Sequence, residues 1–228
     1  HDDQHGTAVV TAAALLNALK IVGKKIEDIN VVINGAGAAG LAIAKFLLRF
    51  GVKDVIVCDS KGILCKGDAR LNGAKQEVAE MSNKRRVTGS LAAAMKGADV
   101  FVGVSVANCV SEEMVRSMAE KAIVFACANP TPEISREKAI AAGAAVVGTG
   151  SSEYPNQINN VLVFPGLFRG ALDVRAKDIN MEMMMAAAQG IASCVSETQL
   201  NPDYILPYAY DPKAHEAVAK AVAQAARN

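Results

Sequence analysis

The chain has 228 residues, of which 51% are hydrophobic, so it can bury a sizeable core as one large domain or as one domain with appendages. Its 24 basic and 23 acidic residues nearly cancel, which argues against nucleic acid or an anionic membrane as a partner and favours a small molecule. The longest apolar stretches are interrupted by Asn17, Lys20 or glycines before they reach the length of a membrane span.

Cysteine usage and the start of the chain bear on the compartment. The cysteines are odd in number, lack CxxC spacing and lie mostly in apolar runs, which indicates reduced thiols and a cytoplasmic location. No charged start followed by an apolar core marks a signal peptide. The sequence opens at His1 without a methionine, so we expect a fragment of a longer protein.

The predicted elements alternate between helix and strand as far as Gly150. A run rich in alanine and leucine from Gly6 to Val22, closed by Gly23, predicts a buried first helix. A strand at 29–34, a helix at 38–50 and a strand at 54–58 follow it. Looser patterns predict helices near 75–82, 90–96, 111–119 and 135–142 and strands at 99–104, 122–128 and 144–148. This alternation predicts an α/β fold, Rossmann-like and doubly wound, with a mostly parallel sheet flanked by helices.

The pattern changes after Gly150. A polar loop, SSEYPNQINN, leads to a short apolar run at 161–164, and long helices are predicted at about 179–196 and 212–226. We expect these helices to pack beside the sheet as a C-terminal helical extension.

A glycine-rich turn joins the first strand to the second helix. Residues 35–40 (GAGAAG) match GxGxxG, in which Gly35 allows a tight turn, Gly37 a close approach to pyrophosphate and Gly40 close packing of helix on strand. A bare GxGxxG occurs in many unrelated turns. Its position between a strand and a helix favours a dinucleotide site, with the anion at the positive end of the helix.

Asp59 ends the next strand, 19 residues after Gly40, where an acidic side chain can bind the adenosine ribose hydroxyls. A carboxylate there repels a 2'-phosphate, which favours NAD over NADP, although Ser60 and Lys61 could still receive such a phosphate. The alternative is a solvated turn residue at the end of a strand.

Two further groups of polar residues are candidates. Asp2 and Asp3 could bind a divalent cation or divide into a metal ligand and a proton-transfer group, but they could also cap the first helix. Asn129 follows a predicted strand, and Asn159 and Asn160 lie in the polar loop. Their amides suit a substrate or nicotinamide site, with a turn before proline and an Asx turn as the alternatives.

Five segments in fixed order resemble the NAD(P)-binding part of bacterial malic enzymes. These are HDDQHGTA, INGAGAAG, CDSKG, ANPTPEI and YPNQINNVLVFPGLFRGALDVRA, and together they span almost the whole chain. The resemblance implies oxidation of L-malate with decarboxylation to pyruvate and CO2, using NAD or NADP and Mg2+ or Mn2+, in a homodimer or homotetramer. It also implies one domain at 1–228, with a leading helix at about 6–23, a Rossmann-like core at 29–150 and a substrate-side loop with C-terminal helices at 151–228.

The resemblance implies a role for individual residues. Asp3 is then a metal ligand and Asp2 a catalytic residue that supports proton transfer. Asn129, Asn159 and Asn160 contact malate. The residues implied in cofactor binding are Thr7, Gly35, Gly37, Ala38, Ala39, Gly40, Asp59, Val104, Ser105 and Asn129.

Two departures limit what can be carried over. Asn108 stands where many relatives have a glycine or another small residue, and the lysine, tyrosine and Glu-Asp metal pair of the family belong to an upstream catalytic domain. We therefore expect the 228-residue chain alone to bind NAD weakly and to turn over no malate.

Two rival interpretations are the nucleotide-binding domain of another dehydrogenase, such as one acting on amino acids, and a non-catalytic NAD-binding regulatory module. The pairs Asp2-Asp3 and Asn159-Asn160 argue against the module, since a sensor needs no metal or substrate groups.

Overall fold

The computed structural model describes residues 2–228, and its account of side chains begins at Gln4. Within this part, six strands form one sheet in the order β3-β2-β1-β4-β5-β6. All neighbouring strands pair in parallel except β3, which runs antiparallel to β2. The strands are β1 (Asn30–Asn34), β2 (Asp54–Asp59), β3 (Gly62–Ile63), β4 (Val100–Gly103), β5 (Ile123–Ala126) and β6 (Val146–Thr149). The predicted doubly wound, Rossmann-like sheet is confirmed.

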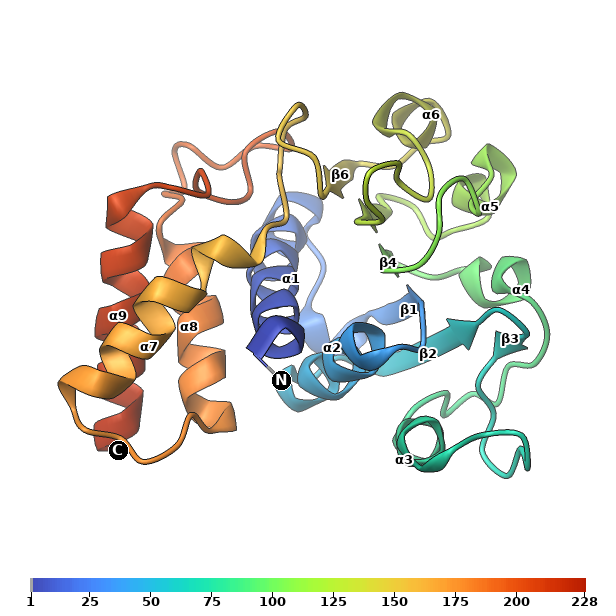
Figure 1. The fold of residues 1–228 in the computed structure, drawn as a ribbon. Coiled ribbons are helices and arrows are strands. Elements are labelled where there is room, and N and C mark those ends of the chain that lie inside the picture. The colour runs from blue at the N-terminus through green and yellow to red at the C-terminus, as the bar shows by residue number, and fades with distance from the viewer. Residues whose placement is uncertain (1) are drawn as a thin grey trace.

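Helices cover both faces of this sheet and continue beyond it as a separate group (Figure 1). Short 3-10 turns, η1 (Ile26–Asp28) and η2 (Asn160–Leu162), follow α1 and the loop after β6. The helices are α1 (Asp2–Val22), α2 (Ala38–Phe50), α3 (Gly73–Met81), α4 (Leu91–Met95), α5 (Glu112–Arg116), α6 (Arg136–Ala141), α7 (Phe164–Asp173), α8 (Met181–Ser193) and α9 (Pro212–Arg227).

Two apolar layers enclose the sheet because alternate strand residues point to opposite faces. On β1, Val31 and Ile33 join the larger cluster, which also contains residues of α1, α2 and the C-terminal helices. Val32 joins the smaller cluster with residues of α4, α5 and α6. The central strands are therefore buried on both faces, which is why they read as nearly continuous apolar runs.

Helix α1 lies between the sheet and the C-terminal helices (Figure 1). Its segment Gln4–Val22 is long and apolar enough to cross a membrane by length and composition, but 72% of that window is buried within the fold. The buried Asn17 amide donates to the carbonyls of Ala192 (3.0 Å) and Ile205 (2.8 Å). These bonds explain why a polar residue is buried in the middle of an apolar helix. Helix α1 is central to the packing of the molecule.

The main departure from the sequence prediction is α7. Its segment, FPGLFRGALD, contains a proline and two glycines, and only a short apolar run was predicted there. The proline occupies the first turn, where helices accept it. A Cβ at Gly166 would lie 2.6 Å from the His215 carbonyl oxygen, and one at Gly170 would overlap the backbone of Ala219. The glycines are thus contact points with α9 rather than helix breakers.

The other differences are local. Residues after Asp59 turn back as the short strand β3, because Gly62 adopts a φ of 119° that reverses the chain. Helix α1 begins at Asp2, earlier than the predicted start at Gly6, so Asp2 and Asp3 belong to its first turn instead of preceding it.

Candidate functional site

A cleft of about 390 Å³ opens at the edge of the sheet where the parallel strands end. Its walls come from α1, the start of α2, the segments after β4, β5 and β6, and the loop that ends at η2. It is lined by Thr7, Val10, Ala39, Val104, Ser105, Cys127, Ala128, Asn129, Gly150, Ile158, Asn159 and Asn160. In open α/β sheets ligands bind outside the carboxyl ends of the strands, where the strand order reverses; here that reversal falls between β1 and β4.

The three glycines of the turn have different surroundings. Gly35 adopts a φ of 125°, and a Cβ there would lie 2.6 Å from the Val104 carbonyl oxygen. A Cβ at Gly40 would overlap the Gly35 carbonyl oxygen, whereas one at Gly37 would meet nothing within 4 Å. The predicted turn and packing roles of Gly35 and Gly40 are confirmed. Gly37 instead leaves room on the open side, where a ligand can approach the backbone.

Helix α2 starts directly after this open position. Its N-cap is Gly37, which offers no side-chain hydrogen bond to the first N–H groups of the helix. These donors and the helix dipole favour a negative group at this end. The residues of the turn therefore fit the pyrophosphate of a dinucleotide.

Seven residues that the sequence predicted for the site line the cleft together: Thr7, Ala39, Val104, Ser105, Asn129, Asn159 and Asn160. They come from positions up to 153 residues apart in the chain, and the fold brings them to one edge of the sheet. This gathering is the observation on which the cofactor and substrate assignments depend.

The three asparagines are held differently. A Cβ at Gly150 would lie 2.9 Å from both amide atoms of Asn129, so that glycine leaves the space in which the Asn129 side chain lies. The Asn159 side chain accepts from the Val161 N–H at 3.0 Å and caps η2, as the Asx-turn alternative predicts. Asn160 belongs to η2 and lines the cleft.

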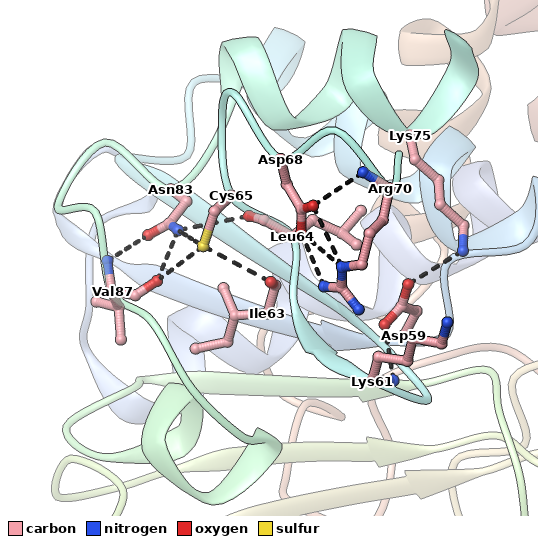
Figure 2. A network of polar contacts seen from close by, with 10 residues as sticks. All are labelled: Asp59, Lys61, Ile63, Leu64, Cys65, Asp68, Arg70, Lys75, Asn83 and Val87. Carbon is pink, nitrogen blue, oxygen red and sulfur yellow. Dashed lines mark hydrogen bonds and ion pairs between the residues drawn. The ribbon is translucent and has the colours of Figure 1, made fainter. Parts of the chain in front are cut away.

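Asp59 lies at the tip of β2, outside the residues that line the cleft. Its carboxylate accepts from the Lys61 N–H at 2.8 Å and forms an ion pair with Lys75 Nζ at 3.1 Å, as Figure 2 shows. Desolvation raises the pKa of Asp59, but the hydrogen bonds from Lys61 and Lys75 and the charge of Lys75 outweigh it and hold the pKa below its ordinary value. Asp59 is thus an ionised acceptor whose charge is partly offset by a lysine.

The loop after β3 is held by its own polar contacts (Figure 2). Arg70 pairs with Asp68 at 2.7 Å, and its hydrogen bonds lower the pKa of that carboxyl. In the segment after α3, the Asn83 amide donates to the Val87 carbonyl at 2.9 Å. The charges of Lys75 and Arg70 both help to lower the pKa of Asp59, and neither residue was expected from the sequence.

Other residues of the site were also missed. Cys127 and Ala128 could have been found as neighbours of Asn129 directly after β5, and Gly150 as the residue that follows β6. Desolvation and the negative charge of Glu133 raise the pKa of Cys127, so this thiol stays protonated in the cleft. Glu133 itself is fully buried, and no local sequence signal distinguished it from an ordinary surface glutamate.

A metal site is not found in this part of the protein. Among the described residues, no three His, Cys, Asp or Glu side chains gather in a way that could hold a metal ion. The side chains of Asp2 and Asp3, predicted as catalytic residue and metal ligand, lie outside the described side chains. The five cysteines, Cys58, Cys65, Cys109, Cys127 and Cys194, are all free.

The parallel sheet, the glycine turn and the cleft at the strand ends define a dinucleotide-binding domain. The family model described as "Malic enzyme, NAD binding domain" matches residues 4–227. The chain belongs to this family of NAD-binding domains.

The relatives agree in sequence and in fold. The chain is 58% identical to the bifunctional malic/malolactic enzyme of Bacillus subtilis (strain 168), over 99% of the chain and 55% of that protein. It is 53% identical to the NAD-dependent malic enzyme of Geobacillus stearothermophilus, over 99% of the chain and 47% of that protein. The crystal structure of the malic enzyme from Pyrococcus horikoshii Ot3 matches with a TM-score of 0.95 and 43% identity, over 100% of the chain and 54% of that structure.

The chain spans about half the length of these relatives. Other relatives are named NADP-dependent malic enzymes.

Proposed function

We propose that this chain is the cofactor-binding part of an enzyme that oxidises L-malate and decarboxylates it to pyruvate and CO2 while reducing NAD(P). The proposal is supported by the seven predicted residues that line one cleft and by membership of the malic enzyme family. A divalent cation, Mg2+ or Mn2+, is part of the proposal, with Asp3 as one of its ligands.

Different residues of the chain bind different parts of the cofactor. The N–H groups at the start of α2, reached over Gly37, Ala38 and Ala39, bind the pyrophosphate. Asp59 accepts from the hydroxyls of the adenosine ribose. Thr7, Val104 and Ser105 line the nicotinamide side of the cleft.

The asparagines orient the reacting groups. Asn129 bonds the nicotinamide ribose or malate, and Asn160, with Asn159 beside it, bonds malate, since amides can both donate to and accept from hydroxyl and carboxylate groups. The cofactor, when bound, accepts a hydride from C2 of malate. Asp2 supports transfer of the proton from the C2 hydroxyl.

NAD is the cofactor that we propose as preferred. The Asp59 carboxylate is ionised and would repel a 2'-phosphate. Lys75 partly offsets this charge at 3.1 Å, and Lys61 lies beside it, so NADP is disfavoured rather than excluded.

The partners and compartment follow from the same proposal. A catalytic domain that supplies the remaining acid-base groups and metal ligands completes the site. The protein acts in the cytoplasm as a homodimer or homotetramer, without a nucleic acid or membrane partner.

The experiment is a steady-state assay of the intact protein that contains this chain, with L-malate, Mn2+ and either NAD or NADP. We expect pyruvate and NADH in equal amounts, with higher kcat/KM for NAD. The 228-residue chain by itself should bind NADH weakly and form no pyruvate. Absence of pyruvate with both cofactors in the intact protein would refute the activity, and turnover by the chain alone would refute the need for a further domain.

A further inference from the structure

A buried carboxylate lies beneath the cofactor cleft. Glu133, in the segment between β5 and α6, is fully buried, with 0% of its surface exposed. Among the residues whose side chains the structure describes, no lysine, arginine or histidine forms an ion pair with it. Burying a charge without a counter-ion is expensive, so other groups must stabilise this carboxylate.

Hydrogen bonds to two loops take the place of a counter-ion. Glu133 Oε2 accepts from the Ser105 backbone N–H at 2.9 Å and from Ser105 Oγ at 3.1 Å. Glu133 Oε1 accepts from the Ala128 N–H at 3.0 Å. Ser105 follows β4 and Ala128 follows β5, and both line the cleft. One carboxylate thus holds two cleft-lining loops at a fixed separation.

The network continues to a third strand. Asn34, the last residue of β1, donates from Nδ2 to Ser105 Oγ at 2.9 Å. The next residue, Gly35, begins the glycine turn. The ends of β1, β4 and β5, which are neighbours in the sheet, are therefore joined by Asn34, Ser105 and Glu133.

The backbone is shaped to admit this carboxylate. A Cβ at Gly103, the last residue of β4, would overlap the carboxyl group of Glu133. The segment that carries Glu133 is also fixed, since the Asn108 N–H donates to the Pro132 carbonyl at 3.0 Å and the Val110 N–H to the Glu133 carbonyl at 3.1 Å. The position of Glu133 is thus determined by main-chain contacts independent of its side chain.

We propose that Glu133 is a positioning residue, which sets the separation of the Ser105 and Asn129 segments so that cofactor and substrate meet in reactive geometry. The last backbone bonds of the ladder run from the Val104 N–H to the Asn34 carbonyl and from the Cys127 N–H to the Gly103 carbonyl, both at 2.9 Å. One residue further along, at Ser105 and Ala128, a charged acceptor with three donors supplies the rigidity. Glu133 does this without contacting either ligand. The inference rests on the proposed function, because it concerns the same cleft.

The decisive variant is Glu133→Gln. An amide keeps the size of the side chain but presents an NH2 group to one of the two loops, so one of the two connections is lost. At saturating substrates and well below the melting temperature, we expect kcat to fall about tenfold and the Kd for NADH to rise about tenfold. Glu137→Gln, an exposed site four residues along, removes the same charge and should leave both within twofold.

Asn34→Ala is the second variant, because it leaves Glu133 and all three of its donors in place while removing the bond to Ser105. We expect a smaller loss for Asn34→Ala, about threefold in kcat. In the double variant of Glu133→Gln and Asn34→Ala, the fold-loss in kcat should be less than the product of the two single fold-losses. Melting temperatures are measured for every variant, since a purely structural role would lower them without changing kcat of the folded enzyme.

Wild-type kcat and NADH affinity in a folded Glu133→Gln protein would overturn the proposal. If that variant does not fold, an unchanged kcat in Asn34→Ala would overturn it instead. The two proposals can fail separately, because NADH titration needs no malate. A wild-type protein that binds NADH but forms no pyruvate would refute only the malate activity. The effect of Glu133→Gln on the Kd for NADH would still test the positioning role.

Discussion

Two carboxylates near the predicted cofactor site are stabilised in different ways. Glu133 is fully buried and accepts from two backbone N–H groups and one hydroxyl, with no ion pair among the described residues. Asp59, partly exposed at the tip of β2, accepts from one backbone N–H and also pairs with a lysine. Donors on the backbone fix distances, because they belong to the loops themselves. A flexible ion pair instead sets the local charge. In our proposals, Glu133 sets the geometry of the cleft, and Asp59 at the tip of β2 sets the preference between NAD and NADP.

The largest effect is expected from the glycine turn between β1 and α2. Gly40→Ala forces a methyl group onto the Gly35 carbonyl oxygen, so we expect a loss of unfolding free energy of about 1–3 kcal/mol or more. Gly37→Ala meets nothing within 4 Å and should cost less than about 1 kcal/mol, yet raise the Kd for NADH on the order of tenfold. Urea unfolding and NADH titration of both variants separate the two effects. Equal stability losses in both would contradict the division of roles.

A smaller effect, on cofactor choice, is expected at the tip of β2. Asp59→Asn removes the repulsion of a 2'-phosphate and should raise the kcat/KM ratio of NADP to NAD on the order of tenfold. Lys75→Ala removes the offsetting charge and should lower that ratio. Glu80→Gln, which removes an exposed carboxylate in the same helix as Lys75, is the matched control and should change the ratio less than twofold. A ratio unaffected by Asp59→Asn, or a wild-type preference for NADP, would refute the assignment.

The smallest effect concerns pH and the residue next to Asp59. Burial raises the pKa of the Cys58 thiol from 9.0 to about 12, with a further contribution from the charge of Asp59. Because the folded pKa lies above the unfolded value, the contribution to stability is complete below pH 9 and is lost as the pH rises toward 12.

Between pH 8 and pH 10, ionisation of the Cys58 thiol in the unfolded state should lower the free energy of unfolding of the wild type by about 1 kcal/mol. Over the same pH interval, the free energy of unfolding of Cys58→Ala should fall by that much less than the free energy of unfolding of the wild type. This difference does not depend on the stability of the variant at pH 8. Urea unfolding at both pH values measures this difference. Parallel losses in the two proteins would show that Cys58 does not titrate on unfolding.

The sequence by itself determined those elements whose local sequence pattern matches the position they take in the fold. The strands of the sheet read as apolar runs because both of their faces are buried, and the helix at Ala38–Phe50 was predicted with its observed bounds, between Gly37 and Gly51. Asn129, after a predicted strand, and Asn159 and Asn160, in the polar loop, were correctly expected near one site, since residues that follow parallel strands reach the same edge of the sheet. Asp59 lies outside the cleft, at the tip of β2.

Only the tertiary structure decided the rest. Gly166 and Gly170 weaken an isolated helix, and α7 forms because they allow α9 to approach closely. Lys75 lies 16 residues from Asp59 and Glu133 lies 28 residues from Ser105, so neither pairing has a local signal. The physical reason is the same in each case: the free energy of a buried charge or a close helix contact depends on its partner, and the fold, not the neighbouring sequence, supplies that partner.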